Sequence, residues 1–326
     1  MHDLAVGIIN WNTRDMTLAC LASLQDELNR LRLDAAVWVV DNASEDGSPE
    51  SIAEAFPQVV LVRNAENVGF AKANNQFLRG CEARYYLLLN PDTIVQKGAV
   101  AALLAEIARQ PHAGAVGPRL ILGNGNIQRS HWRLPSMASE LRYNLVHRFR
   151  PFGPLWRWVF QRRLPDLART EQTVPVEALS MACLLLDARA LKRVGLLAED
   201  CFLFGEENDF FCRMRSTAWR GYYVPKASVT HLVGQSRSKQ RSRLSETYFF
   251  RSRALYFRKH RSQSWRGYRR MCAFFLNWSL LVTWIALALG RGDREDLHFY
   301  RELAAMLEKD IPAVSGRSPA EVESQC

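Results

Sequence analysis

The chain has 326 residues, 48% of them apolar, which is enough to bury a substantial core and excludes a disordered protein. Its formal net charge of +10 comes largely from arginine and lysine residues in the segments 129–163 and 237–270. This uneven distribution indicates an anionic partner: nucleic acid, a phosphate-bearing substrate or an acidic membrane surface.

The N-terminal region alternates short apolar runs with segments of helical periodicity. Strands are predicted at 4–9, 35–40, 59–62 and 85–89, with helices at 16–24, 49–55 and 70–78 between them and a further helix at 98–109. Strands that alternate with helices predict an α/β fold, a mostly parallel sheet flanked by helices on both faces. In such sheets ligands bind beyond the carboxyl ends of the strands.

Polar residues follow each of these strands. They occupy positions 10–12, 41–48, 64–69 and 90–92. Each group taken alone also fits a helix cap or a solvated turn. Because the carboxyl ends of parallel strands meet at one edge, the four groups together favour a ligand site there. The clearest example is the apolar run 85–89, which leads through Asn90 and Pro91 into Asp92 and so carries a carboxylate to the sheet edge.

The pattern changes after residue 110. Residues 114–126 are glycine-rich and are predicted as a loop and a strand, 176–186 as a strand, 188–194 as a short helix and 222–224 as a last strand. The segment 149–164 mixes aromatic residues with arginine, which favours a membrane interface; an acceptor groove, single-stranded nucleic acid or a solvated helix fits the same composition.

An acidic cluster, Glu206, Glu207 and Asp209, lies between apolar residues. Crowding and partial burial raise the proton affinity of such carboxylates, which is typical of a general base. The acidic first turn of a helix gives the same pattern. His231 follows the last predicted strand, and a lone histidine is more often an ordinary surface or core residue than a ligand.

Five ordered segments resemble the inverting glycosyltransferases of family 2, which have the GT-A fold, and within them the bacterial rhamnosyltransferase-like branch. The matching segments are 9–13, 39–48, 67–75, 87–92 and 204–209. Their order and spacing agree with the family over residues 4 to about 260. The resemblance implies a Rossmann-like catalytic domain that binds a nucleotide sugar.

The resemblance also implies a nucleotide-sugar site. Its residues are Ile9, Trp11, Asp41, Gly69, Asn90 and Asp92. Asp41 would bond the nucleobase, the Ile9 backbone and the Trp11 ring would border the base, and Asn90 would lie near the ribose.

Asp92 stands where the family places a metal-binding carboxylate, and the expected ion is Mg²⁺ or Mn²⁺. His231, in a Thr-His-x-x-Gly segment that ends at Gly234, matches a position that approaches the metal or the diphosphate. Asn90 replaces the other aspartate of the family's Asp-x-Asp motif, so the donor's phosphates are expected to complete the metal site.

Glu207 matches the position of the catalytic base, which takes the proton of the acceptor hydroxyl. The family usually carries Glu-Asp-Val-Asp where this chain has Glu-Glu-Asn-Asp at 206–209. The side chain of Glu207 is therefore longer by one methylene, and Asp209 is the alternative base.

The segment 271–289 contains no charged residue and is long enough for a helix of about 28 Å, close to the bilayer core of about 30 Å. We expect it to be membrane-embedded or interfacial; a buried helix is the alternative. The expected domains are a catalytic domain at 1–240, with an acceptor-side insertion at about 127–175, and a basic, hydrophobic, membrane-associating helical region at 241–326.

The expected function is transfer of rhamnose or another hexose from a dTDP-, UDP- or GDP-linked donor to a lipid-linked or polysaccharide acceptor. No secretory pattern opens the chain and no Cys-x-x-Cys pair occurs among its seven cysteines, so we expect the cytoplasmic face of the inner membrane. A nucleic-acid-binding protein would not explain the carboxylates at the edge of the sheet. A nucleotidyltransferase would carry a glycine- and lysine-rich triphosphate loop near the N-terminus, and the sequence shows none. A non-catalytic sugar-binding scaffold is the remaining alternative.

Overall fold

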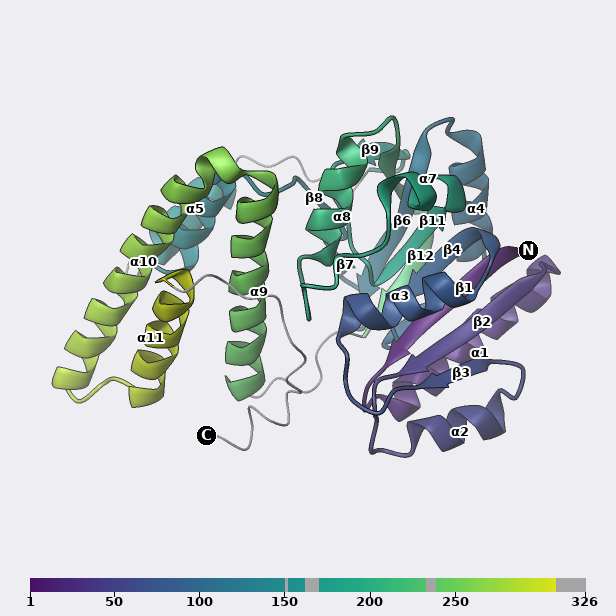
Figure 1. The fold of residues 1–326 in the computed structure, drawn as a ribbon, viewed down its shortest axis with the longest axis horizontal. Helices are drawn as coiled ribbons and strands as arrows, with labels where there is room; N and C mark the ends of the chain where they lie inside the picture. Colours follow the sequence, from purple (N-terminus) through teal and green to yellow (C-terminus); the bar gives the residue numbers. More distant parts are fainter. Residues whose placement is uncertain (150–151, 162–169, 233–238, 309–326) are drawn as a thin grey trace. The chain divides into compact units, whose positions relative to one another are not determined.

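A computed structural model describes residues 1–149, 152–161, 170–232 and 239–308 (Figure 1). The chain divides into two compact units. The sheet unit comprises residues 1–134 and 170–232, and the helical unit comprises residues 135–149, 152–161 and 239–308. Gly234, the start of the basic segment at 237, and parts of the aromatic segment 149–164 lie outside the described residues.

The main sheet of the sheet unit is mostly parallel. Its path is β3 (Val60–Arg63), β2 (Ala35–Asp41), β1 (His2–Asn10), β4 (Ala83–Leu89), β11 (Cys183–Asp187), β6 (Ala113–Leu122), β12 (Arg220–His231) and β5 (Thr93–Val95). The first four strands are parallel, and β12 is parallel to β6. Strand β11 lies antiparallel between β4 and β6, and β5 is antiparallel to β12. The predicted α/β fold is confirmed.

Helices cover both faces of this sheet (Figure 1). One face carries α1 (Arg14–Leu31), α2 (Ser48–Ala55) and α4 (Ala99–Arg109); the other carries α3 (Phe70–Gly80), α7 (Ala188–Val194) and α8 (Glu206–Arg215). Strand β1 supplies both sides of the core. Leu4 and Ile8 enter the cluster beneath α1 and α4, whereas Gly7 admits Phe77 of α3 so closely that a Cβ would lie 2.2 Å from its ring.

Strand direction brings distant residues to one edge. Because β6 and β4 are both antiparallel to β11, β12 runs in the same direction as β1, β2 and β4. The carboxyl ends of these strands therefore lie at the same edge of the sheet. That edge receives Asn10, Asp41, Asn90 and His231.

Three predicted strand boundaries are wrong. The segment 176–186 covers the last residue of β9 (Val174–Val176), all of β10 (Ala178–Leu179) and most of β11 rather than one strand, and 114–126 contains most of the long strand β6. Strand β12 continues to His231, so this residue ends a strand rather than lying in a loop. The prediction stopped at Val224 because Pro225 breaks the pattern, and the structure accommodates it with a register shift between Val224 and Ser228.

Two further short strands complete the sheet unit, and five helices form the helical unit. The strands are β7 (Ile127–Gln128), paired with β6, and β8 (His131–Trp132), paired with β10. The helices are α5 (Met137–His147), α6 (Gly153–Gln161), α9 (Lys239–His260), α10 (Ser262–Ala288) and α11 (Arg294–Glu308). Among the described helices, α10 has the length and apolarity to cross a bilayer, with a mean hydropathy of 1.8 in its most apolar window.

Candidate functional site

The loops after β1 and β2 are bonded to each other at the sheet edge. The Asn10 side-chain amide donates to Asp41 Oδ1 at 2.6 Å and to Ser44 Oγ at 3.0 Å. The other carboxylate oxygen of Asp41 accepts from the Ser44 backbone N–H at 2.9 Å. Asp41 is only 2% exposed. Its carboxylate therefore holds the loops after β1 and β2 together at the sheet edge.

Strained backbone gathers around this edge. Of the four described non-glycine residues with positive φ, Asn12, Ala43 and Phe204 lie in the loops that follow β1 and β2 or precede α8. The Asn12 side chain accepts from the Glu45 N–H at 2.8 Å, which holds the first loop on the second. Such conformations cost about 1–3 kcal/mol each and cluster at ligand sites.

The two residues predicted to border the nucleobase differ in solvent exposure. Trp11 is 42% exposed, whereas Ile9, at the end of β1, is buried. An indole ring is thus open to a planar ligand beside the ordered Asp41 loop.

Gly69 has a packing role that the sequence did not indicate. Its φ is +84°, and a Cβ at this position would lie 2.8 Å from the Phe202 carbonyl oxygen. The same oxygen accepts from the Phe70 N–H at 3.0 Å, at the start of α3. Gly69 therefore lets the segment that leads into α8 approach the loop after β3.

Asp92 and His231 meet at the edge although 139 positions separate them in sequence. Strand β12 pairs with β5 so that His231 lies opposite Thr93, and the Leu232 N–H donates to the Asp92 carbonyl at 2.8 Å. The His231 Nε2 lies 3.1 Å from Asp92 Oδ1, and its Nδ1 lies 2.8 Å from Gln128 Oε1. Backbone pairing thus fixes both predicted metal ligands.

The chemistry of this pair fits a divalent metal ion. With Nδ1 donating to the Gln128 amide oxygen, the lone pair of Nε2 would face the Asp92 carboxylate, and a cation could bind between the two. Adjacent ligand atoms on octahedral Mg²⁺, with bonds of about 2.1 Å, are about 3.0 Å apart. Nearby, Asn90 Oδ1 is buried without a hydrogen-bond partner. Within the described ranges no three His, Cys, Asp or Glu side chains form a complete protein cage.

The carboxylates of α8 have distinct environments. Glu206 is buried, and burial followed by the negative charge of Glu207 raises the pKa of its carboxyl well above the usual value. Asp209 is also buried and is ion-paired with Arg213 at 2.8 Å. The Arg213 guanidinium in turn donates to the Leu196 carbonyl at 2.7 Å, so Asp209 holds α8 against the segment after α7.

Glu207 is half-buried at the N-terminus of α8. Its Oε2 accepts from the Gly205 N–H at 2.9 Å and its Oε1 from the Asn208 amide at 3.0 Å. The Trp132 indole N–H donates to Asn208 at 3.0 Å, which ties the start of α8 to the segment that also contains Gln128. The structure thus joins Asp41 with Asn10 and Asp92 with His231 by direct bonds, and joins Glu207 to its own helix terminus.

Comparison with known proteins gives consistent matches. The model of glycosyl transferase family 2 matches residues 5–164. The N-acetylglucosaminyl-diphospho-decaprenol L-rhamnosyltransferases of two Mycobacterium tuberculosis strains are 30% identical over 207 residues, which is 60% of this chain. The match spans 66% of the length of these relatives.

Two solved structures share the fold. A mannosyltransferase from Pyrobaculum calidifontis, in complex with GDP-Man and Mn²⁺, aligns with 99% of this chain and 79% of its own at 16% identity and a TM-score of 0.54. GalNAc-T7, with UDP, GalNAc and Mn²⁺, aligns with 95% of this chain and 56% of its own at 15% identity and a TM-score of 0.55.

Proposed function

Because this chain belongs to glycosyltransferase family 2, we propose that it transfers a sugar from a nucleoside diphosphate to an acceptor hydroxyl, with inversion at the anomeric carbon. The observation that carries the proposal is the Asp92–His231 pair at the carboxyl edge of the sheet, in the same rim as the Asp41 loop. The name of the mycobacterial relatives supports rhamnose as the sugar and a lipid-linked diphosphate as the acceptor.

Donor binding is assigned to the predicted set at this edge. The set is Ile9, Trp11, Asp41, Gly69, Asn90 and Asp92. The exposed Trp11 ring supports contact with the base of a dTDP-, UDP- or GDP-linked sugar. Gly69 acts by shaping the loop rather than by offering a side chain.

Asp92 and His231 would hold Mg²⁺ or Mn²⁺, since both ions take carboxylate oxygen as a ligand and the imidazole nitrogen of His231 lies 3.1 Å from that carboxylate. Such an ion supplies positive charge that neutralises the leaving nucleoside diphosphate. Gln128 orients the imidazole, as outer partners of metal-bound histidine do. The Asn90 side-chain oxygen is buried without a hydrogen-bond partner and would have to become exposed to accept a bond from a donor hydroxyl.

Glu207 is the proposed base. Gly205 and Asn208 donate to its half-buried carboxylate at the N-terminus of α8, and the Arg213 guanidinium engages the Asp209 carboxylate. Glu207 would accept the proton of the acceptor hydroxyl as that oxygen attacks the anomeric carbon and the diphosphate leaves.

The site of action would be the cytoplasmic face of the inner membrane, which the apolar helix α10 and the lipid-linked acceptor of the relatives support.

Donor binding is tested by the thermal stability of the full chain with dTDP-, UDP- and GDP-sugars, with and without Mn²⁺. The cognate donor at a hundred times its dissociation constant adds about 2.7 kcal/mol to the free energy of unfolding. Asp92→Ala should remove the Mn²⁺-dependent part of this gain, while the exposed control Asp26→Ala should respond like the wild type. A full Mn²⁺ response in Asp92→Ala would contradict the metal assignment.

A further inference from the structure

Helix α10 has two contrasting faces. Successive residues of an α-helix are about 100° apart around its axis, so residues separated by three, four or seven positions share a face. The buried face carries Tyr268, Cys272, Phe275, Leu276 and Ser279. The opposite face carries Phe274, Leu281, Trp284 and Ile285, with exposed fractions of 58%, 49%, 61% and 44%. The helix is therefore packed against protein on one side and apolar on its solvent side.

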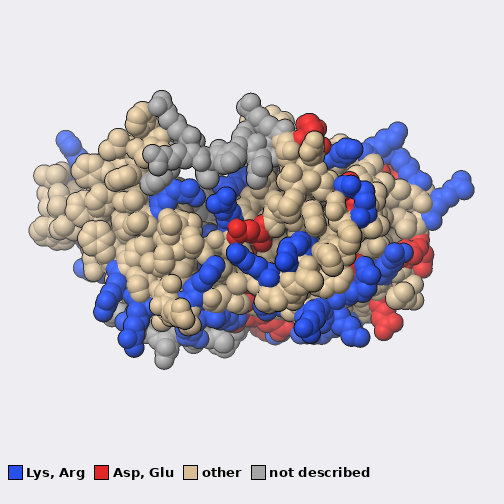
Figure 2. All heavy atoms as spheres, turned by 90° about the horizontal axis from the view of Figure 1, so that it is seen from above, with Lys and Arg blue, Asp and Glu red and all other residues tan. Residues whose placement is uncertain are grey.

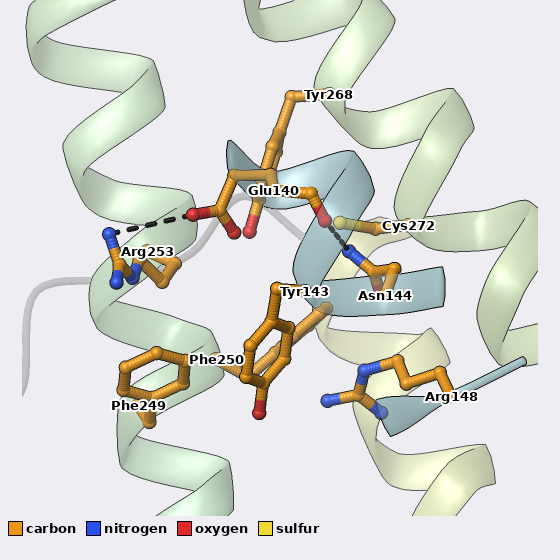
Figure 3. Close-up of a pocket in the computed structure, with 9 residues that line it drawn as sticks. All are labelled: Glu140, Tyr143, Asn144, Arg148, Phe249, Phe250, Arg253, Tyr268 and Cys272. Atoms are coloured by element: carbon orange, nitrogen blue, oxygen red, sulfur yellow. Dashed lines mark hydrogen bonds and ion pairs between the residues drawn. The ribbon is translucent and has the colours of Figure 1, made fainter. Parts of the chain in front are cut away.

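The buried face of α10 adjoins charged groups. Tyr268 and Cys272 line a cavity of about 10 Å³ together with Glu140, Arg148 and Arg253 from α5 and α9 (Figure 3). In this cluster the Arg253 guanidinium lies 3.5 Å from the Glu140 carboxylate, and Arg148 is buried.

Helix α11, which also packs on α10, begins with acidic residues that bind Arg243 of α9. A membrane-crossing α10 would have to leave these partners or take their charges into hydrocarbon, where each unsatisfied polar group costs several kcal/mol. The packing therefore favours a helix that lies along a membrane surface.

The outer face of α10 is basic as well as apolar. Arg266 and Arg270 precede Phe274 by eight and four positions, are exposed and share its face. Arg291 and Arg294 follow the other end of the helix and are also exposed. No aspartate or glutamate occurs between Glu246 and Asp293. Figure 2 shows basic side chains over the helical unit, at the left of the view.

A second apolar patch lies beside α10. Helix α6 and the residue before it expose Phe152, Leu155 and Trp158. Phe149, at the junction of α5 and α6, packs against Phe275 and Trp278 of α10, with ring centroids 5.9 Å and 4.8 Å apart. The two exposed apolar surfaces thus belong to one packed group of helices.

We propose that the outer face of α10, defined by Arg266, Arg270, Phe274, Leu281, Trp284 and Ile285, docks in the plane of an anionic lipid surface. Its aromatic and aliphatic side chains would enter the interface while the arginines contact lipid phosphates. A second copy of the chain is disfavoured as the occupant, because the face offers no carboxylate to pair with its own arginines. This inference specifies the mode of the membrane association proposed above.

The test is sedimentation of the full-length chain with vesicles of phosphatidylcholine alone or with phosphatidylglycerol. We expect binding to the anionic vesicles that weakens as salt rises, and release of bound protein by alkaline carbonate. Leu281→Ser/Trp284→Ser should lower affinity at least tenfold, while Leu141→Ser/Val60→Ser, which alters two residues of similar exposure elsewhere, should not. Arg266→Gln/Arg270→Gln should lower it about 30-fold, since each basic residue contributes about 1 kcal/mol at such a surface.

The charge-matched control is Arg109→Gln/Arg193→Gln, which lowers the net charge equally at exposed positions of the sheet unit and should bind like the wild type. If alkaline carbonate does not release the protein from the vesicles, the helix spans the bilayer and the proposal is overturned. So would a dimer that Leu281→Ser/Trp284→Ser dissociates, or unchanged vesicle binding in that variant. The assay requires no sugar transfer, so its failure is distinct from a failure of the proposed enzymatic function.

Discussion

Asp41 and Asp92 both follow a buried strand, yet the structure gives their carboxylates different surroundings. Asp41 is bonded by Asn10 and Ser44, whereas Asp92 is partly open and faces His231. The sequence predicted that both lie at one edge, because strand ends can be located from apolar runs. It could not predict which carboxylate is open, since that depends in part on partners more than thirty positions away in the chain, Asn10 for Asp41 and His231 for Asp92.

Gln128 shows the same limit, and Arg213 shows the opposite case. Gln128 bonds His231 across 103 positions, and Arg213 engages Asp209 within α8. The first contact leaves no local signal. The second has one, because the pair is spaced i, i+4 on an acidic helix, and this spacing is a reason to prefer Glu207 as the base.

Gly69→Ala should destabilise the protein by about 2–3 kcal/mol, because the added methyl group meets the Phe202 carbonyl in addition to straining the backbone. Gly98→Ala is the matched control. Its φ of +81° is similar, but nothing lies within 4 Å of the added Cβ, so it should cost about 1 kcal/mol. Chemical denaturation of both variants measures the difference; equal losses would contradict the packing role of Gly69.

Among the elements, those with strong local patterns were predicted and those set by pairing were not. Strands β1 to β4 are short apolar runs bounded by turns, and the helices between them have clear periodicity. Strand β11 was predicted only as part of a longer strand, and its antiparallel direction depends on β4 and β6 beside it. The uncharged segment 271–289 marked α10, but its charged neighbours are visible only in the packed helices.

The charge cluster under α10 predicts a pH-dependent stability of the helical unit. Burial raises the pKa of the Glu140 carboxyl, while Arg253 and Arg148 act in the opposite direction. Arg253→Met removes one of these charges and should cost about 3 kcal/mol near neutral pH, because a buried carboxylate loses its partner. Glu140→Leu/Arg253→Met should recover most of that loss.

The direction in which stability changes with pH follows from proton linkage. A carboxyl whose pKa is higher in the folded state binds its proton more tightly there, so stability is lost as pH rises from the unfolded pKa through the folded one. Arg253→Met should steepen this loss above pH 4.5. Arg63→Met, which breaks the exposed pair with Glu50, is the control and should cost less than about 1 kcal/mol. Chemical denaturation at a series of pH values from 4.5 upward measures the free energy of unfolding. A free energy of unfolding of Arg253→Met that does not change with pH would contradict the account.

For the whole molecule, the uneven charge of the sequence corresponds to two units with different chemistry. The sheet unit gathers the carboxylates, the strained loops and the Asp92–His231 pair, and the helical unit carries the basic helices and the exposed apolar face of α10. Composition predicted an anionic partner without distinguishing a nucleotide from a lipid. We propose a separate surface for each, the edge of the sheet for the nucleotide and the outer face of α10 for the lipid.

Sugar transfer itself is the most direct test of the central claim. With Mn²⁺, dTDP-rhamnose and a lipid-linked N-acetylglucosaminyl diphosphate, we expect a rhamnosylated lipid with inverted anomeric configuration. Glu207→Gln should lower the rate at least a hundredfold while retaining donor stabilisation, because only proton acceptance is lost. A product of retained configuration, or a wild-type rate in Glu207→Gln, would contradict the proposed mechanism.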